Sequence, residues 1–313
     1  MTNTSTYKKK GKQLYFEANN SEAIKNFNKA IEREPEDSES WNFRGRCKYF
    51  LKQYEEAVKD LDKAIKLDDK NSDSWNFRGS CKYWLNQYEE AVKDLDKAIE
   101  LNDKNYDSWH FRGCCKYWLK QYKDAVTDLD KAIKLDPKNS DIWHFRGRCK
   151  YWLNQYEDAV KDLDKSIELD DKNYHSWDFR GSCKFHLNQY EDAVKDLDKA
   201  IKLDPKNSES WDFRGRCKYW LKQYEEAIKD FNKAIELDNK NYDSWHFRGS
   251  CKYWLNQYEE AVKDLDKATE LDPEDSVIWD IRGICKYWLN QYEEAVKDLD
   301  KATELDPEDF VSW

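Results

Sequence analysis

Hydrophobic and polar positions recur along this chain at a fixed interval of 34 residues. Tryptophans mark the copies from Trp41 to Trp313, and a glycine lies four residues after all but the last, first at Gly45. In the first copy, Tyr7 and Gly11 hold the same two places. A repeat of this length predicts an array of small helical units, each of which buries its apolar surface against its neighbours.

Each copy predicts two helices. In the second copy, residues 41–54 contain no proline and place Trp41 and Gly45 at helical spacing, which indicates the first helix. Glycine inside a helix costs about 1 kcal/mol relative to alanine, so its return in every copy predicts that the second helix packs closely against it. Residues 55–67 carry one apolar stripe, which indicates the second helix and consists of Ala57, Val58, Leu61, Ala64 and Ile65.

The end of each copy carries helix-stop signals. All five prolines of the chain occupy the slot just after the second helix, where they end it. Asp, Asn or Ser next to that slot is expected to supply the turn and the N-cap of the next first helix, with Ser38, Ser72 and Ser140 as candidates. Each copy is therefore predicted to form a helix, a tight turn, a second helix and a short loop.

Opposite charges recur on the two predicted helices. Arg44 and its equivalents lie three residues after the tryptophan, and Asp60 and its equivalents lie on the second helix. In the first copy both are absent together, replaced by Lys10 and Asn26. We therefore expect a partly buried ion pair between Arg44 and Asp60, and between their equivalents. An alternative, in which these arginines contact a ligand, is disfavoured because they lie on the stripe that faces the second helix.

These features resemble the tetratricopeptide repeat, and the resemblance covers residues 4–313. The chain departs from the family where Arg44 and Lys48 replace residues that are usually large and apolar. The residues that carry the resemblance in the second copy are Trp41, Gly45, Tyr54, Ala57, Leu61 and Ala64, with a proline at the closing slot in about half of the copies.

The resemblance implies an all-α fold, a right-handed α-solenoid superhelix of antiparallel helix pairs. The first helices would line a concave groove, and the second helices would form the convex side. We expect a single solenoid over residues 4–309, with a short disordered N-terminus at residues 1–3 and the start of a truncated tenth repeat at residues 310–313. Its nine units are expected to start near residues 4, 38, 72, 106, 140, 174, 208, 242 and 276.

Partners of this family usually bind in the concave groove, and two slots on the predicted groove face differ between copies. One slot follows the tryptophan and the other follows the glycine, while a row of tyrosines lies further round the same face. A partner-reading surface would vary in this way, although drift on an exposed face would look the same. The residues expected to contact a partner are Asn42, Arg46, Tyr49, Asn76, Tyr83, His110, Cys114, Tyr117, His144, Arg148, Tyr151, Asp178, Asp212, Arg216, Tyr219, His246, Tyr253 and Asp280.

Two further aromatic rows have two interpretations. One row begins at Phe43, and the other begins at Phe50 and continues with Trp84. Their helical spacing favours packing between successive first helices. In the alternative interpretation, both rows line the groove.

No combination of residues points to catalysis or to a cofactor. Every glycine and proline and eight of the nine cysteines hold repeated structural slots, so none is left to build a phosphate loop or a nucleophile turn. His110, Cys114 and His144 have zinc-ligand chemistry, but their spacing follows from the repeat and no closed set of four ligands accompanies them. We therefore expect no enzyme, no cofactor and no metal site.

The charge balance is acidic. Charged residues make up 38% of the chain, and its formal net charge is −10 at pH 7. This balance disfavours nonspecific binding to nucleic acid or to an anionic membrane, and no apolar run is long enough to span a membrane. The cysteines recur in an apolar helical slot rather than in a disulfide pattern, which favours a reducing, cytoplasmic setting.

The last full copy is more apolar than the others. Val277, Ile281 and Ile284 replace residues that are mostly polar or aromatic elsewhere, and Trp313 begins a tenth copy. A solenoid normally ends in a polar capping helix. Self-association through this end, giving a homo-oligomer, is therefore one prediction.

The sequence thus predicts a non-enzymatic scaffold that binds a protein or peptide partner in an aromatic, polar groove. Two alternatives stay open: self-assembly through the C-terminal end, and binding of single-stranded nucleic acid by stacking on tyrosine and tryptophan, which the acidic balance opposes. Chaperone-binding members of the family clamp a peptide carboxylate with lysines and asparagines. Only Lys8 and Lys12 of the first copy resemble that arrangement.

Overall fold

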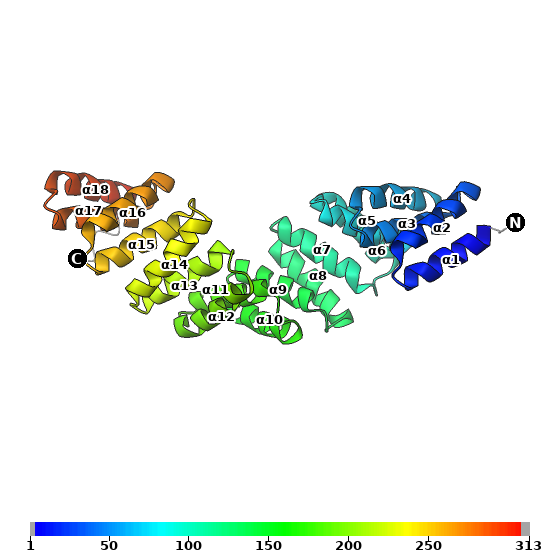
Figure 1. The fold of residues 1–313 in the computed structure, drawn as a ribbon, viewed down its shortest axis with the longest axis horizontal. Coiled ribbons are helices and arrows are strands. Elements are labelled where there is room, and N and C mark those ends of the chain that lie inside the picture. Colours follow the sequence, from blue (N-terminus) through cyan, green and yellow to red (C-terminus); the bar gives the residue numbers. More distant parts are fainter. Residues whose placement is uncertain (1–3, 308–313) are drawn as a thin grey trace. The chain divides into compact units, whose positions relative to one another are not determined.

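The computed structural model describes residues 4–307, and over these residues the protein consists of α-helices joined by short loops, with no strand (Figure 1). The all-α fold class expected from the sequence is confirmed. Trp313 and the predicted terminal segments at residues 1–3 and 310–313 lie outside the described residues. The course of the nine units as one superhelix stays a prediction.

The chain divides into two compact units, Met1–Gln155 and Tyr156–Trp313, which are described separately. The described part of unit 1 contains α1 (Thr4–Phe16), α2 (Asn20–Arg33), α3 (Ser38–Phe50), α4 (Tyr54–Leu67), α5 (Ser72–Trp84), α6 (Tyr88–Leu101), α7 (Tyr106–Trp118), α8 (Tyr122–Leu135) and α9 (Ser140–Trp152). The described part of unit 2 contains α10 (Tyr156–Leu169), α11 (Tyr174–His186), α12 (Tyr190–Leu203), α13 (Ser208–Trp220), α14 (Tyr224–Leu237), α15 (Tyr242–Trp254), α16 (Tyr258–Leu271), α17 (Ser276–Trp288) and α18 (Tyr292–Leu305).

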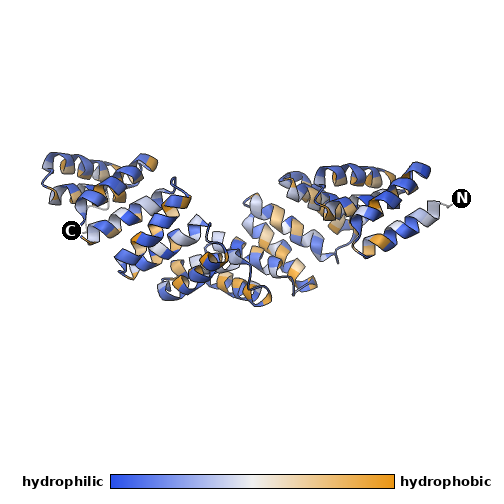
Figure 2. Ribbon diagram, in the orientation of Figure 1, coloured by the Kyte–Doolittle hydropathy of each residue, from blue (hydrophilic) through white to orange (hydrophobic). Residues whose placement is uncertain are grey.

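Odd-numbered helices are the first helices of the repeats, and even-numbered helices are the second helices. Within each unit a helix packs against its neighbours in sequence, and successive first helices also touch; α5, for example, contacts α3, α4, α6 and α7. Polar and apolar residues alternate around the helices (Figure 2). This pattern lets each helix bury one stripe and leave the rest in water.

The two helices of a pair approach closely at the repeated glycine. A β-carbon built on Gly45 would lie only 2.7 Å from Leu61 Cγ and 3.3 Å from the carbonyl oxygen of Ala57. Ala57, Leu61 and Ala64 are almost fully buried at this contact. The expectation that the glycine marks a close approach of the second helix is confirmed.

The turn inside each pair follows one design. Lys52 adopts a positive φ of 59°, and Gln53 N–H donates to the Lys48 carbonyl at 2.9 Å while Lys52 N–H donates to the Tyr49 carbonyl at 2.9 Å. These two bonds form a Schellman motif, which ends the first helix without a glycine. Asparagine or lysine holds this position in all later copies. The turn fixes the direction in which the last residue of each first helix points.

The N-caps lie one residue before the predicted serines. Asn71 Oδ1 accepts hydrogen bonds from Asp73 N–H and Ser74 N–H, and Asn139 Oδ1 accepts one from Asp141 N–H. The prediction of serine caps was therefore wrong: Ser38, Ser72 and Ser140 are the first helical residues. Asparagine replaces serine in this role because its longer side chain reaches the same backbone donors.

A charged network joins the two helices of seven repeats. Arg78 donates from Nε and Nη2 to the two carboxylate oxygens of Asp94 at 2.8 and 2.6 Å, and Lys82 Nζ lies 2.7 Å from the same carboxylate. The guanidinium also lies over the Trp75 ring at 4.7 Å. The expected ion pair is confirmed here and for Arg44–Asp60, Arg112–Asp128, Arg180–Asp196, Arg214–Asp230, Arg248–Asp264 and Arg282–Asp298.

The same arginine also reaches the preceding repeat. Arg78 Nη1 donates to Asp62 Oδ1 of α4 at 2.6 Å. This contact holds successive repeats in register through one side chain. The arginine and lysine that depart from the family pattern therefore neutralise one buried carboxylate, which explains why they occur together.

We expect Asp94→Ala to lower the free energy of unfolding by about 3–5 kcal/mol, because it leaves Arg78 and Lys82 without their buried partner. Asp62→Ala is the matched control, since it removes an exposed carboxylate from the same guanidinium and should cost about 1 kcal/mol or less. Chemical denaturation followed by circular dichroism measures both. Equal losses for the two variants would contradict the buried network.

Candidate partner-binding surface

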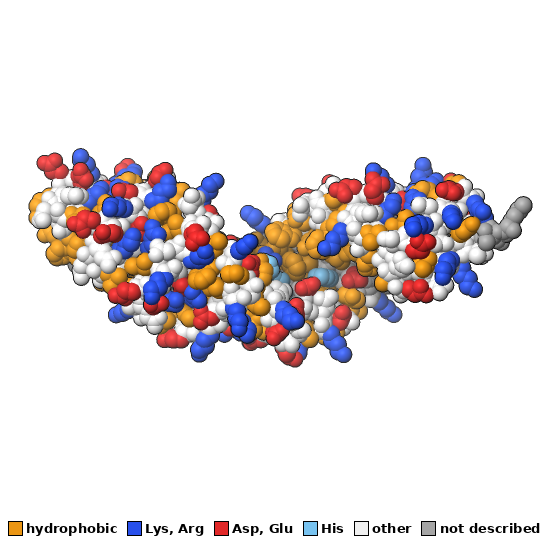
Figure 3. Space-filling model, viewed as in Figure 1, with side chains coloured by type: hydrophobic (Ala, Val, Ile, Leu, Met, Phe, Trp, Pro, Cys, Tyr) orange, Lys and Arg blue, Asp and Glu red, His pale blue; other side chains and the backbone are white. Residues whose placement is uncertain are grey.

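Every first helix ends in an exposed ring, and we call these residues the aromatic row. Trp84 is 50% exposed, although a tryptophan in a helix normally buries most of its ring. Hydrophobic side chains are visible on the surface of the molecule (Figure 3). The row consists of Phe16, Phe50, Trp84, Trp118 and Trp152 in unit 1 and His186, Trp220, Trp254 and Trp288 in unit 2.

One or two contacts hold each tryptophan of the row in place. One face of Trp118 stacks on Tyr88 of the preceding second helix, with ring centroids 6.1 Å apart and planes 10° apart. In some copies the indole N–H also donates to a tyrosine hydroxyl of the preceding first helix, as in Trp152 Nε1 to Tyr117 Oη and Trp254 Nε1 to Tyr219 Oη, both at 3.2 Å. The ring is therefore oriented before any partner arrives, and its remaining surface faces water.

The two aromatic rows with an open interpretation behave differently. Phe43 is buried, and Phe77 packs edge to face on Tyr49 of the preceding first helix with ring centroids 5.3 Å apart. The phenylalanine row is therefore packing between first helices. The row that contains Trp84 is exposed and stays a candidate for partner contact.

The tyrosines expected to contact a partner lie deeper than the tryptophans. Tyr117 is buried, and burial raises the pKa of Tyr49 to about 12. Each tyrosine precedes a member of the aromatic row, and Tyr49, Tyr83, Tyr117 and Tyr219 pack edge to face on the next phenylalanine. Half-buried members of the expected set are Tyr49, Tyr83, Tyr151, Tyr219 and Tyr253.

The slot after the repeated tryptophan is buried, contrary to the expected groove surface. Asn42 Nδ2 donates to Ser74 Oγ of the next first helix at 2.7 Å, and Ser108 Oγ donates to Asn76 Oδ1 at 2.8 Å. The slot therefore joins successive repeats, and its variation reflects the neighbouring repeat. The buried members are Asn42, Asn76, His110, His144, Asp178, Asp212 and His246, whereas Asp280 is half-buried.

Two of the three histidines in this slot match a change in the next repeat. Ile142 and Ile278 stand where other copies have the serine, and His110 and His246 precede them. Burial lowers the pKa of His110 to about 4, and its Nε2 has no hydrogen-bond partner among the described residues. The imidazole is therefore neutral and packs against an apolar neighbour.

The slot after the glycine contains the expected residues Arg46, Arg148 and Arg216, each of which lies on aromatic rings. Arg148 Nη2 donates to Tyr117 Oη at 2.7 Å, and its guanidinium lies 4.4 Å from that ring. Cys114 occupies the same slot in α7 and is buried. These arginines are half-buried, so contacts within the chain already cover part of each side chain.

The residues with zinc-ligand chemistry do not assemble into a site. His110, Cys114 and His144 are buried, and no group of three potential ligands occurs in the part of the chain that the structure describes. Burial raises the pKa of the Cys114 thiol well above its ordinary value, which disfavours the thiolate that binds metal.

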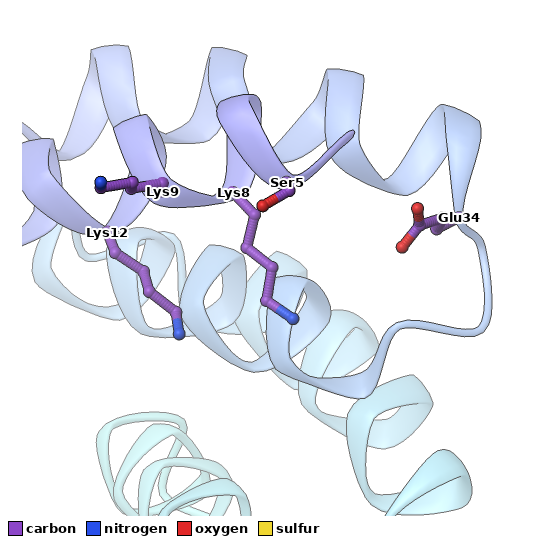
Figure 4. A pocket seen from close by; sticks show the side chains of 5 residues that line it. All are labelled: Ser5, Lys8, Lys9, Lys12 and Glu34. Atoms are coloured by element: carbon purple, nitrogen blue, oxygen red, sulfur yellow. The ribbon is translucent and has the colours of Figure 1, made fainter. Parts of the chain in front are cut away.

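The lysines near the N-terminus line a shallow pocket together with Ser5 and Glu34 (Figure 4). Lys8 Nζ lies 2.8 Å from Asp37 Oδ1 and 2.7 Å from Glu39 Oε2, and Lys12 also pairs with Glu39. The two lysines that resembled a carboxylate clamp are therefore already neutralised by carboxylates of the second repeat.

The last repeat exposes part of its apolar surface. Val277 is 45% exposed, while Ile281 and Ile284 are half-buried and Trp313 lies outside the described residues. Self-association through these residues stays a prediction. None of the described helices is long and apolar enough to cross a membrane.

Comparison with protein families finds the same repeat. Sequence models of the tetratricopeptide repeat match residues 119–177, 175–207, 213–241, 242–275 and 287–309. A model of the anaphase-promoting complex, cyclosome, subunit 3 matches residues 17–98, and one of the protein prenyltransferase alpha subunit repeat matches residues 88–115. Comparison with curated proteins finds no match.

Solved structures share the fold. One is YrrB, described as a TPR protein with an unusual peptide-binding site. The match has 21% sequence identity and a TM-score of 0.52, and it covers 60% of this chain and 96% of the YrrB chain. Another is the APC/C hetero-tetramer Cut9–Hcn1, at 14% identity and a TM-score of 0.59, covering 92% of this chain and 56% of that one. At these identities the similarity concerns the fold alone.

The buried Asp212 gives a prediction for pH. Burial raises its pKa to about 6, although Arg216 and the Ser244 hydroxyl favour the ionised form. Because the folded-state pKa lies above the ordinary value of 3.8, ionisation destabilises the fold as pH rises from about 4 through 6. Asp212→Asn, which copies Asn76, should therefore raise the free energy of unfolding by roughly 1–3 kcal/mol at pH 7.5 and by nothing below pH 4.

Denaturation of wild type and variant at both pH values measures the difference. Asp243→Asn is the control, because it removes the other carboxylate beside Arg216 and should show no such gain. A gain from Asp212→Asn that is the same at pH 3.5 and pH 7.5 would contradict the assignment.

Proposed function

Because the chain belongs to the tetratricopeptide repeat proteins, we propose that it is a non-enzymatic scaffold whose aromatic row binds a peptide segment of a partner protein. The observation that carries the proposal is the row of half-exposed indoles, one per repeat over most of the chain. Exposed apolar surface in a regular series marks interaction sites. Tryptophan is also the residue most enriched where binding energy concentrates.

The way the rings are held favours tight binding. Tyr88 and the hydroxyl of Tyr83 position Trp118, so little side-chain entropy is lost when a partner covers it. The spacing of one ring per repeat suits an extended or helical segment that crosses several repeats. The peptide-binding site named for the similar YrrB structure agrees with this class of ligand.

The other features of the chain fit this function. Its net charge of −10 opposes a nucleic-acid ligand, which needs a basic track along the binding surface. All nine cysteines are free and buried, which supports a reducing compartment such as the cytoplasm.

We expect the double variant Trp84→Ala, Trp118→Ala to weaken partner binding at least tenfold, because each ring contributes about 2 kcal/mol at a binding hot spot. Proteins captured from a lysate of the source cell by wild type but not by this variant are purified, and their affinity is measured by isothermal titration calorimetry. Leu135→Ala removes an exposed apolar side chain outside the row and should leave affinity unchanged.

Circular dichroism confirms that the double variant is folded before binding is compared. If both variants capture the same proteins with equal affinity, the aromatic row is not the binding surface. If nuclease treatment releases everything that wild type captures, the ligand is nucleic acid and the proposal is wrong.

A further inference from the structure

The chain contains its own example of a bound guanidinium. The Arg46 guanidinium lies 4.8, 4.9 and 4.8 Å from the ring centres of Tyr15, Phe43 and Phe77, which belong to three successive first helices. Its Nε and Nη2 donate to the Tyr15 hydroxyl, and its Nη1 donates to Asp73 Oδ2 at 3.0 Å. Aromatic faces and one carboxylate are the groups that bind a guanidinium best in a partly buried setting.

The same arrangement recurs in unit 2. Arg216 lies 4.9, 5.1 and 5.1 Å from the rings of Phe185, Phe213 and Phe247. Its Nη1 is 3.7 Å from Asp243, the residue that corresponds to Asp73. Two units thus build one kind of guanidinium site, from three rings and a carboxylate in the first turn of the next first helix.

Two first helices of unit 1 keep this surrounding and lack the arginine: α5, with Ser80 in the slot, and α7, with the buried Cys114. On α5 the place of Arg46 is taken by Ser80, whose hydroxyl donates to the Asn76 carbonyl at 2.9 Å. The three corresponding rings are Tyr49, Phe77 and Phe111. All three are half-buried, so part of each side chain is exposed to solvent. Arg46 lies over Phe77 at 4.8 Å, whereas no lysine or arginine of the described residues lies over Tyr49 or Phe111.

The carboxylate is also kept. Asp107 corresponds to Asp73, is half-buried, and forms no ion pair within residues 4–307. Burial raises the pKa of Asp107, with the Tyr106 hydroxyl as a hydrogen-bond partner that favours the ionised form. Its charge also raises the pKa of Tyr49, after the larger effect of burial. A cation placed there would relieve the cost of this half-buried charge.

The Tyr49 hydroxyl can accept a hydrogen bond from a guanidinium, although it already accepts one from the Trp84 indole N–H. Tyr117 does both at once, since Trp152 Nε1 and Arg148 Nη2 donate to its hydroxyl at 3.2 and 2.7 Å. The tyrosine therefore links the aromatic row to the arginine place beside it.

We propose that the place of Ser80 binds an arginine side chain of the partner protein, with the guanidinium on Tyr49, Phe77 and Phe111 and paired with Asp107. The inference rests on the proposed function and specifies the partner: its segment carries an arginine beside the apolar residues that cover Trp84. Ser250 in unit 2 offers a comparison, because Val277 and Ile281 stand where Asp107 and Phe111 do.

The test uses pools of blocked nonapeptides with a fixed central residue and random flanks. The full-length protein is titrated with pools whose centre is arginine, lysine or citrulline, the last being uncharged and close in shape to arginine. We expect the arginine pool to bind at least tenfold more tightly than the citrulline pool. Asp107→Asn should weaken that preference, and so should Ser80→Arg, which fills the place from within as Arg46 does.

Ser250→Arg is the matched control, since it adds the same side chain at the equivalent slot and should leave the arginine preference intact. Equal binding of arginine and citrulline pools by wild type would overturn the inference, and so would an arginine preference that Asp107→Asn and Ser80→Arg both leave unchanged. Because Asp107→Asn keeps size and shape, its result decides the question if Ser80→Arg fails to fold.

The outcome is separable from that of the proposed function. If Trp84→Ala, Trp118→Ala abolishes partner binding while the arginine preference is absent, the aromatic row binds and the inference alone fails. If the arginine preference depends on Asp107 while the tryptophan variant binds the partner normally, the arginine place stands and the proposed role of the row fails.

Discussion

The structure depends on a buried carboxylate that two cations share. Asp94 and its equivalents sit between the helices of a repeat, where a lone negative charge would be strongly destabilising. The bidentate arginine and the lysine one turn later neutralise it, and the tryptophan ring covers the guanidinium. This group fixes the angle between the helices more narrowly than apolar packing does, because hydrogen bonds are directional and aliphatic contacts are not.

That fixed geometry is what allows the aromatic row. The Schellman turn follows directly from the end of the first helix, so the last ring of each helix has one direction set by the backbone. Stacking on a tyrosine of the preceding second helix then removes the remaining freedom of the ring. The chain, in which 38% of the residues are charged, thus keeps large apolar rings at its surface. The rings do not cluster together, because a full repeat separates each ring from the next.

The period of the sequence predicted the fold class, the helix pairs and the Arg44–Asp60 ion pair, since each follows from a contact inside one repeat. It did not predict which face was open. The slot of Asn42 varies and is polar, which suggested a surface, yet it is buried against Ser74 of the next repeat. A helical projection cannot separate these cases, because burial between repeats depends on how the pairs stack and not on one helix.

The rows differ for a similar reason. Tyr49 and Trp84 are equally aromatic, and only the stacking of successive helices buries the first and exposes the second. The Schellman turn was hidden because lysine and asparagine, rather than glycine, adopt the positive φ. A comparison of each slot with its neighbour 32 residues later would have revealed the pairing of Asn42 with Ser74 and of His110 with Ile142.

The junction between Asn76 and Ser108 has a consequence for how such an array grows. Near-identical copies invite duplication or loss of whole repeats when the gene recombines. A copy that carries aspartate in this slot would meet an apolar isoleucine if moved beside Ile142 or Ile278. The framework residues are shared by the copies and would permit any order. The residues of this slot are not shared, so the order of the copies along the chain matters.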